Sequence, residues 1–139
     1  MISKSLKKRP SQKTILVIED ERPLVHAIQT KLEKGGLAVI TARTVEQGLN
    51  YLEDVDVIDV IWLDHYLLGN ETGLDLVMKL KNPTNKWSKI PIFVVSNTAS
   101  STNVQSYIRL GVSKYCVKAE HRLDGIVRDI KSFLDSPEE

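Results

Sequence analysis

Residues 57–64 read VIDVIWLD, a short run of mostly apolar and β-branched residues that stops at an acid, Asp64. A continuous run of this kind is typical of a strand buried on both faces of a parallel sheet. Similar runs recur along the chain, at residues 14–18, 37–42, 90–95 and 115–117. The sequence therefore predicts five short strands, of which the third ends at Asp64 and the fourth at Ser96.

Helical patterns separate these strands. Leu24, Ile28 and Leu32 recur at the spacing of one helix face, and Thr44 with Gln47 predicts a capping box at the start of the next helix. Three further helices are expected from about residues 73, 101 and 123. Strands that alternate with helices indicate parallel pairing, because each parallel connection needs a crossover. We therefore expect an α/β fold of the flavodoxin-like class: a (βα)5, doubly wound, five-stranded parallel sheet with helices on both faces.

The length and charge indicate one domain. The chain has 139 residues and a formal net charge of +1, which gives no overall attraction to nucleic acid or to a membrane. Residues 1–13 contain lysine and arginine but no acid, so we expect a disordered basic arm, with a binding arm for an acidic partner as the alternative. The expected domain covers residues 14–136, and residues 137–139 form a tail.

Two further features bear on the compartment. The single cysteine, Cys116, cannot form an internal disulfide and is expected to be a buried small apolar residue, which fits a reducing compartment. No long apolar segment follows the basic start, as a signal peptide or a membrane span would require. The sequence predicts a cytoplasmic protein.

The polar residues at the strand ends predict the functional site. In a sheet of this class, ligands bind beyond the carboxyl ends of the strands, where Glu19, Asp20, Asp64, Ser96 and Lys118 are expected to meet. Two carboxylates about 4 Å apart repel by about 4 kcal/mol at an effective dielectric near 20, so three gathered acids call for a cation. Hard oxygen ligands on an open rim suit Mg²⁺, and a carboxylate beside it is a suitable phosphoryl acceptor.

These residues, in this order, resemble the receiver domain of response regulators from about Lys13 to Leu134. The acidic pair is similar to the family's metal-binding pair, residues 59–64 to its phosphoacceptor strand, and residues 73–76 to the glycine-led start of its third helix. Ser96 stands at the position of the switch hydroxyl, Tyr115 at that of the rotameric aromatic and Lys118 at that of the family's lysine.

The resemblance implies a set of roles. Asp64 would be the phosphoacceptor, and Asp20, Asp64 and the backbone carbonyl of Tyr66 would bind Mg²⁺, with Glu19 acting through water. Lys118 and Ser96 would contact the phosphoryl group, and Ser96 and Tyr115 would change position on phosphorylation.

The resemblance also implies partners. A histidine kinase or a histidine phosphotransfer protein would supply the phosphoryl group, and a downstream protein would bind the face of the fourth helix, fifth strand and fifth helix. The expected protein is a stand-alone, single-domain phosphorelay switch and not an enzyme, beyond catalysing its own phosphoryl acceptance and dephosphorylation.

Two positions depart from the family pattern. Ala119 stands where a proline usually follows the lysine, and Asn97 stands where a smaller residue follows the switch hydroxyl. We hypothesise that Asn97 alters the lifetime of the phosphoryl group. These departures leave open a phosphate-independent docking module of receiver shape.

Two enzyme or binder classes fit less well. A Mg²⁺-dependent phosphohydrolase of the haloacid dehalogenase type usually has a second aspartate where Tyr66 stands, and a nucleotide or flavin binder needs a glycine-rich loop where residues 19–21 are acidic. His26, His65 and His121 lack the spacing of a zinc site. His65 is expected to be packed or exposed, and Trp62 to lie near the floor of the site.

Overall fold

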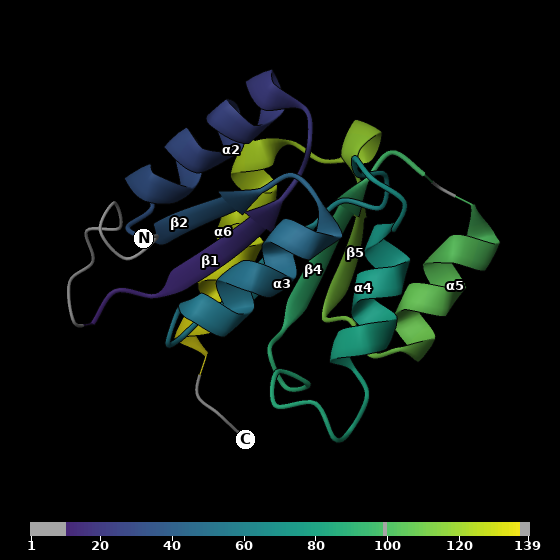
Figure 1. Cartoon of the computed structure of the whole chain (residues 1–139). Helices are drawn as coiled ribbons and strands as arrows, with labels where there is room; N and C mark the ends of the chain where they lie inside the picture. Colours follow the sequence, from purple (N-terminus) through teal and green to yellow (C-terminus); the bar gives the residue numbers. More distant parts are fainter. Residues whose placement is uncertain (1–10, 99, 137–139) are drawn as a thin grey trace.

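The computed structural model describes residues 11–98 and 100–136 and contains one five-stranded parallel sheet (Figure 1). The strand order is β2-β1-β3-β4-β5. The strands span β1 Thr14–Ile18, β2 Ala38–Ala42, β3 Val60–Leu63, β4 Ile92–Ser96 and β5 Lys114–Val117. All neighbouring pairs are parallel. The predicted doubly wound fold is thus confirmed.

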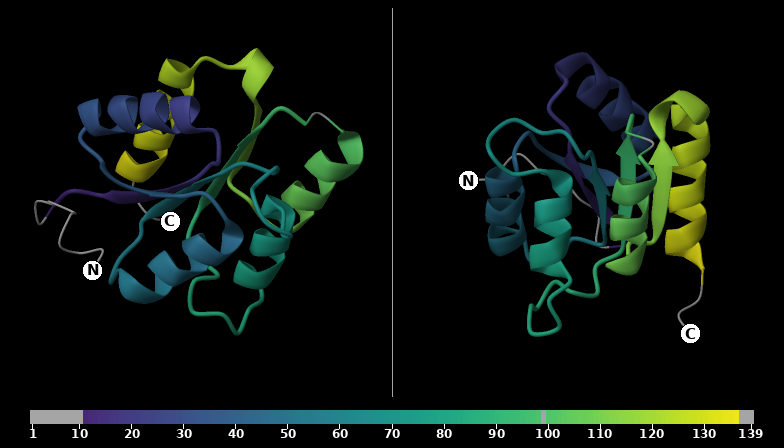
Figure 2. Two further views of the ribbon diagram at one scale, coloured as in Figure 1. Left: turned by 45° about the horizontal axis from the view of Figure 1, so that its top comes forward. Right: turned by 90° about the vertical axis from the view of Figure 1, so that its right-hand side faces the viewer.

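Helices cover both faces of the sheet, as the edge-on view in Figure 2 shows. Helices α2 (Arg22–Lys34) and α6 (Leu123–Asp135) lie on one face. Helices α3 (Val45–Asp54), α4 (Gly73–Leu80) and α5 (Ser101–Arg109) lie on the other, and a short 3-10 helix, η1 (Lys118–Glu120), follows β5. None of the helices within the described part of the chain is long and apolar enough to cross a membrane.

The alternation of side chains along the strands builds two cores. Leu16, Ile61 and Val94 point to the core under α3, α4 and α5, whereas Val17 and Trp62 point to the core under α2 and α6. All five of these side chains are essentially inaccessible to solvent. Burial on both faces explains why the strands are continuous apolar runs rather than alternating ones.

Strands β2 and β3 start later than the sequence predicted, and both depend on where their neighbour β1 begins. Strand β1 begins at Thr14, which pairs with Ala38 on one side, while the carboxylate of Asp59 accepts a hydrogen bond from the Thr14 N–H at 2.7 Å on the other. The ladder on both sides therefore starts level with Thr14, and Val57 lies outside it with 54% of its surface exposed. At β4, the expected start at residue 90 is also early, because Pro91 has no N–H for the ladder.

Side chains cap the starts of α3, α4 and α5. Thr44 Oγ1 accepts the Gln47 N–H at 3.0 Å as predicted, but the Gln47 carboxamide accepts from Arg43 N instead of Thr44 N, so the expected capping box is half formed. A complete capping box precedes α4, where the side chains of Thr72 and Asp75 each accept a hydrogen bond from the other's backbone N–H.

Most of the expected basic arm, residues 1–10, and the expected tail, residues 137–139, lie outside the described residues.

Candidate functional site

The acidic residues meet where β1 and β3 end, at the point where the connections leave in opposite directions. One carboxylate oxygen from each of Glu19, Asp20 and Asp64 lies within 4.8 Å of the others. Glu19 and Asp64 are buried, with 1% and 5% of their surfaces exposed, and Asp20 is half-buried. The structure thus brings together the three carboxylates that the sequence singled out.

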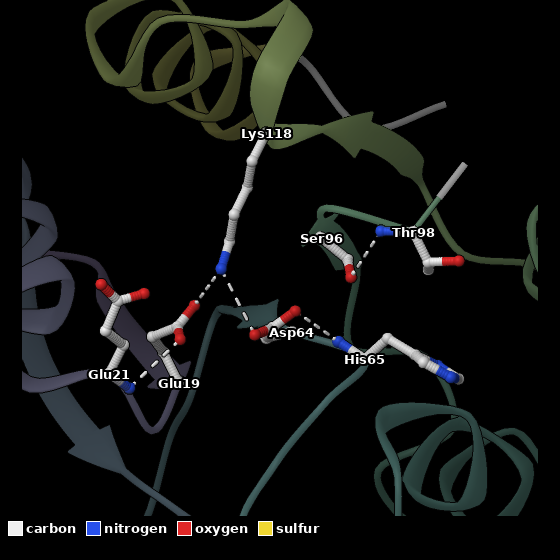
Figure 3. A network of polar contacts seen from close by, with 7 residues as sticks. All are labelled: Glu19, Glu21, Asp64, His65, Ser96, Thr98 and Lys118. Atoms are coloured by element: carbon white, nitrogen blue, oxygen red, sulfur yellow. Dashed lines mark hydrogen bonds and ion pairs between the residues drawn. The ribbon is translucent and has the colours of Figure 1, made fainter. Parts of the chain in front are cut away.

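Lys118 reaches the same point from the end of β5 (Figure 3). Its Nζ lies 2.9 Å from Glu19 Oε1 and 3.3 Å from Asp64 Oδ2. Burial alone would lower the pKa of Lys118, but its hydrogen bond with Glu19 and the charge of Asp64 more than offset this and raise it. One permanent positive charge therefore stands against three acids.

Glu19 has a raised pKa in this cluster. Burial, reinforced by the negative charge of Asp64, raises the pKa of Glu19 to about 6, although the contact with Lys118 and the Glu21 N–H oppose the shift. Three gathered carboxyl groups, one of which resists ionisation, form a site at which a bound divalent cation would stabilise the charged forms. Arg43 supports the same loop, because its guanidinium donates to the backbone carbonyl of Asp20 at 3.1 Å.

Ser96 and Tyr115 are connected through the loop after β4. The Ser96 side chain is fully buried next to Asp64 (Figure 3), and its Oγ accepts from Thr98 N at 3.4 Å. Tyr115 donates its hydroxyl hydrogen bond to the Thr98 carbonyl at 2.6 Å. The two predicted switch residues thus contact the same residue, Thr98.

His65, the residue after Asp64, is hydrogen-bonded both to the site and to helix α5. Its backbone N–H donates to Asp64 Oδ1 at 2.7 Å, and its ring points away from Asp64 (Figure 3). The ring Nδ1 lies 2.7 Å from the hydroxyl of Tyr107 on α5. Burial lowers the pKa of His65, although the charges of Asp64 and Asp75 oppose the shift. The sequence left open whether His65 is packed or exposed, and the structure shows it packed, against a partner that nothing in the sequence indicated.

Other predicted residues lie around this centre. Tyr66, two positions after Asp64, has 59% of its surface exposed. Trp62 is buried in the core under α2 and α6 and, together with Lys118, lines a cavity of about 160 Å³. Among the described residues its indole Nε1 has no hydrogen-bond partner. Cys116 is buried, as expected. Asn97 is exposed beside the buried Ser96.

An acidic cluster at the strand ends of a (βα)5 sheet, with a lysine and a buried hydroxyl, defines the receiver class of signalling domains. Residues 15–129 match the family model described as "Response regulator receiver domain". The chain therefore belongs to the response regulator receiver domain family, whose members act as phosphoacceptor switches in two-component signalling.

Curated relatives are similar over part of their length. The KDP operon transcriptional regulatory protein KdpE of Escherichia coli is 29% identical over 105 residues, 75% of this chain and 44% of that protein. The phosphate regulon transcriptional regulatory protein PhoB of Pseudomonas aeruginosa is 28% identical over 106 residues, 76% of this chain and 45% of that protein. The chain thus spans about half the length of the curated relatives that it matches.

Solved structures share the fold. A receiver domain protein from Methanospirillum hungatei superposes with a TM-score of 0.79 at 24% identity, covering 90% of this chain and 95% of that one. The phosphorylated cyanobacterial phytochrome response regulator RcpA superposes with a TM-score of 0.81 at 24% identity, covering 92% and 98%. At this identity the likeness supports the architecture alone.

Proposed function

We propose that this receiver domain accepts a phosphoryl group on Asp64 in the presence of Mg²⁺. The observation that carries the proposal is the convergence of Glu19, Asp20 and Asp64 within 4.8 Å, with Lys118 against two of them. A cation at this point would neutralise the acids, and phosphoryl transfer needs positioning and charge neutralisation more than acid–base chemistry.

The residues divide the work as follows. Asp20, Asp64 and the Tyr66 carbonyl would hold the metal, with Glu19 acting through water, and the bound metal would supply positive charge to the phosphoryl oxygens. An oxygen of Asp64 forms a bond to phosphorus as the bond from phosphorus to the donor's histidine nitrogen breaks. The His65 N–H, 2.7 Å from Asp64 Oδ1, orients the acceptor carboxylate, while Lys118 and Ser96 contact the transferred group.

The partners follow from this chemistry. A histidine kinase or a histidine phosphotransfer protein supplies the phosphoryl group in the cytoplasm, and a downstream protein binds the face of α5, β5 and α6. Phosphorylation shifts the equilibrium between two conformations of this face, and the change is passed on through Ser96, Thr98 and Tyr115. Catalysis is confined to the domain's own phosphoryl acceptance and loss, and Asn97, exposed beside Ser96, alters how long the group persists.

Intact mass spectrometry after treatment with acetyl phosphate tests the proposal. The wild type should gain the mass of one phosphoryl group with Mg²⁺ and none with EDTA, and Asp64→Asn should gain none. Asp56→Asn removes an exposed acid just before β3 and should behave as the wild type. A wild type that stays unmodified, and that a histidine phosphotransfer protein also fails to modify, would instead indicate a phosphate-independent docking module.

A further inference from the structure

The contact between His65 and Tyr107 joins the acceptor loop, residues 64–72 between β3 and α4, to helix α5. The Nδ1 of His65 and the hydroxyl of Tyr107 are 2.7 Å apart, and their rings meet edge to face with centroids 5.7 Å apart. Both residues are buried, with 7% and 0% of their surfaces exposed. A hydrogen bond in such a place is directional and poorly replaced by water, so it fixes the distance between the two elements.

His65 is held on both sides. Its backbone N–H bonds Asp64 Oδ1 at 2.7 Å, and its carbonyl accepts the Gly73 N–H at 2.9 Å, where α4 begins. A displacement of the Asp64 carboxylate is therefore passed to the backbone of His65 and, through its ring, to Tyr107.

Close packing at Gly73 brings the same groups to one point. A Cβ atom at this position would lie 2.4 Å from the Asp64 carbonyl oxygen and 2.9 Å from the Tyr107 hydroxyl. Close packing at Gly73 thus joins the start of α4 to the end of β3 and to the side chain of Tyr107, and leaves no space for an additional methyl group. Packed contacts of this kind transmit small displacements instead of absorbing them.

Tyr107 also packs against Tyr115, the aromatic residue expected to change position on phosphorylation. Its ring lies 5.5 Å from that of Tyr115, tilted by 47°, and Tyr115 in turn bonds the Thr98 carbonyl. Phenylalanine would fill the same core volume, so packing alone does not require the Tyr107 hydroxyl. The hydroxyl serves the bond to His65.

We propose that Tyr107, acting through His65, is a positioning residue that couples the phosphoacceptor loop to Tyr115 and helix α5. This connection runs in parallel with that from Ser96 through Thr98. The inference rests on Asp64 being the phosphoacceptor, and it assigns to α5 a buried link to the residue directly after the acceptor.

Amide NMR with Mg²⁺ and beryllofluoride, a phosphoryl mimic, tests the coupling. The Asp20 amide reports occupancy of the site, whereas the amides of Tyr115 and of α5 report the distant response. In the wild type both sets of signals should shift. In Tyr107→Phe the Asp20 signal should shift as before, while the distant shifts fall to roughly half or less, as the loss of one coupling contact implies.

Companion variants separate coupling from packing. His65→Leu should reduce the distant shifts as Tyr107→Phe does, and the double variant should be no worse than either single one. His65→Asn, which keeps a polar group near the position of Nδ1, should restore much of the response. Tyr51→Phe removes a hydroxyl from α3 in the same core and should change nothing.

Three results overturn the inference. Full distant shifts in Tyr107→Phe would show that the hydroxyl carries no coupling. Effects of His65→Leu and Tyr107→Phe that add in the double variant would show that the residues act separately. If the wild type shows no shift at Asp20 or Tyr115, the phosphoacceptor role itself fails, and the coupling fails with it.

Discussion

Glu19 is the residue at which the electrostatic cost of the site is concentrated. It is buried beside Asp64 and has a pKa raised to about 6, while Lys118 offsets only part of the repulsion. Between pH 4.5 and about 6 the folded protein therefore keeps a proton that the unfolded chain releases. In the metal-free protein, the contribution of Glu19 to the free energy of unfolding should rise as the pH falls through this range.

The same proton competes with a metal. Mg²⁺ affinity, followed by the fluorescence of Trp62, should fall as the pH drops from about 7.5 to about 5.5, because protonated Glu19 withdraws a negative charge from the site. Glu19→Gln should bind Mg²⁺ more weakly at neutral pH and lose most of the pH dependence above pH 5. A wild-type affinity that is flat across pH 6 would contradict the shift assigned to Glu19.

Gly73 is the residue most constrained by close approach. Gly73→Ala places a Cβ within 2.4 Å of the Asp64 carbonyl oxygen, so α4 or the acceptor loop must move, and we expect the free energy of unfolding to fall by about 1–3 kcal/mol. Phosphoryl acceptance should slow as well, because Asp64 itself is displaced. Urea denaturation and acetyl phosphate labelling measure the two effects.

Gly125 provides the matched control for this change. It lies within α6, and a Cβ there would come no closer than 3.5 Å to its nearest neighbour. Gly125→Ala should therefore raise the free energy of unfolding by about 0.5–1 kcal/mol through helix propensity, without affecting labelling. Equal effects of the two substitutions would show that close packing at Gly73 is unimportant.

At the scale of the elements, the sequence predicted what depends on local pattern. The five apolar runs became five strands, and the site residues at their carboxyl ends followed from the parallel topology. The starts of β2 and β3 were placed too early, because they depend on where their common neighbour β1 begins, at Thr14. A boundary set by a neighbouring strand is not encoded in the run itself.

The capping box at the start of α4 stabilises the helix that follows the acceptor loop. Thr72→Ala removes the hydroxyl that accepts the Asp75 N–H, and we expect the free energy of unfolding to fall by about 1 kcal/mol. Urea denaturation measures this loss. Thr44→Ala, at the half-formed box of α3, should cost a similar amount but leave acetyl phosphate labelling unchanged, whereas Thr72→Ala should slow labelling. Unchanged labelling in Thr72→Ala would show that the start of α4 does not position Asp64.

At the scale of the whole molecule, what the sequence missed are the contacts between distant segments. His65 and Tyr107 are 42 positions apart, and nothing in the pattern around either predicts the hydrogen bond between them. Trp62 was placed near the floor of the site by the alternation of the strand, and it lies in the core under α2 and α6, reaching the site through a cavity shared with Lys118. Strand ends can be aligned from topology, whereas side-chain partners require the packed structure.

We expect the gathered acids to make the stability of the whole domain depend on Mg²⁺. Without metal, three acids lie together and Lys118 contacts only Glu19 and Asp64 among them. Asp64→Asn therefore removes a repelling charge and should raise the free energy of unfolding by about 1–3 kcal/mol, even though it weakens the contact with Lys118. With Mg²⁺ at about ten times its dissociation constant, the wild type should gain about 1.4 kcal/mol, because the metal binds the folded chain. Asp64→Asn should gain much less.

The two proteins should therefore differ without metal and converge with it, which urea denaturation in EDTA and in Mg²⁺ measures directly. Asp56→Asn, which changes the net charge equally at an exposed position, controls for long-range charge and should track the wild type in both buffers. If Asp64→Asn is as unstable as the wild type in EDTA, then Lys118 already balances the cluster. The acids would then have no electrostatic need for a cation, and metal binding would have to draw on ligand geometry alone.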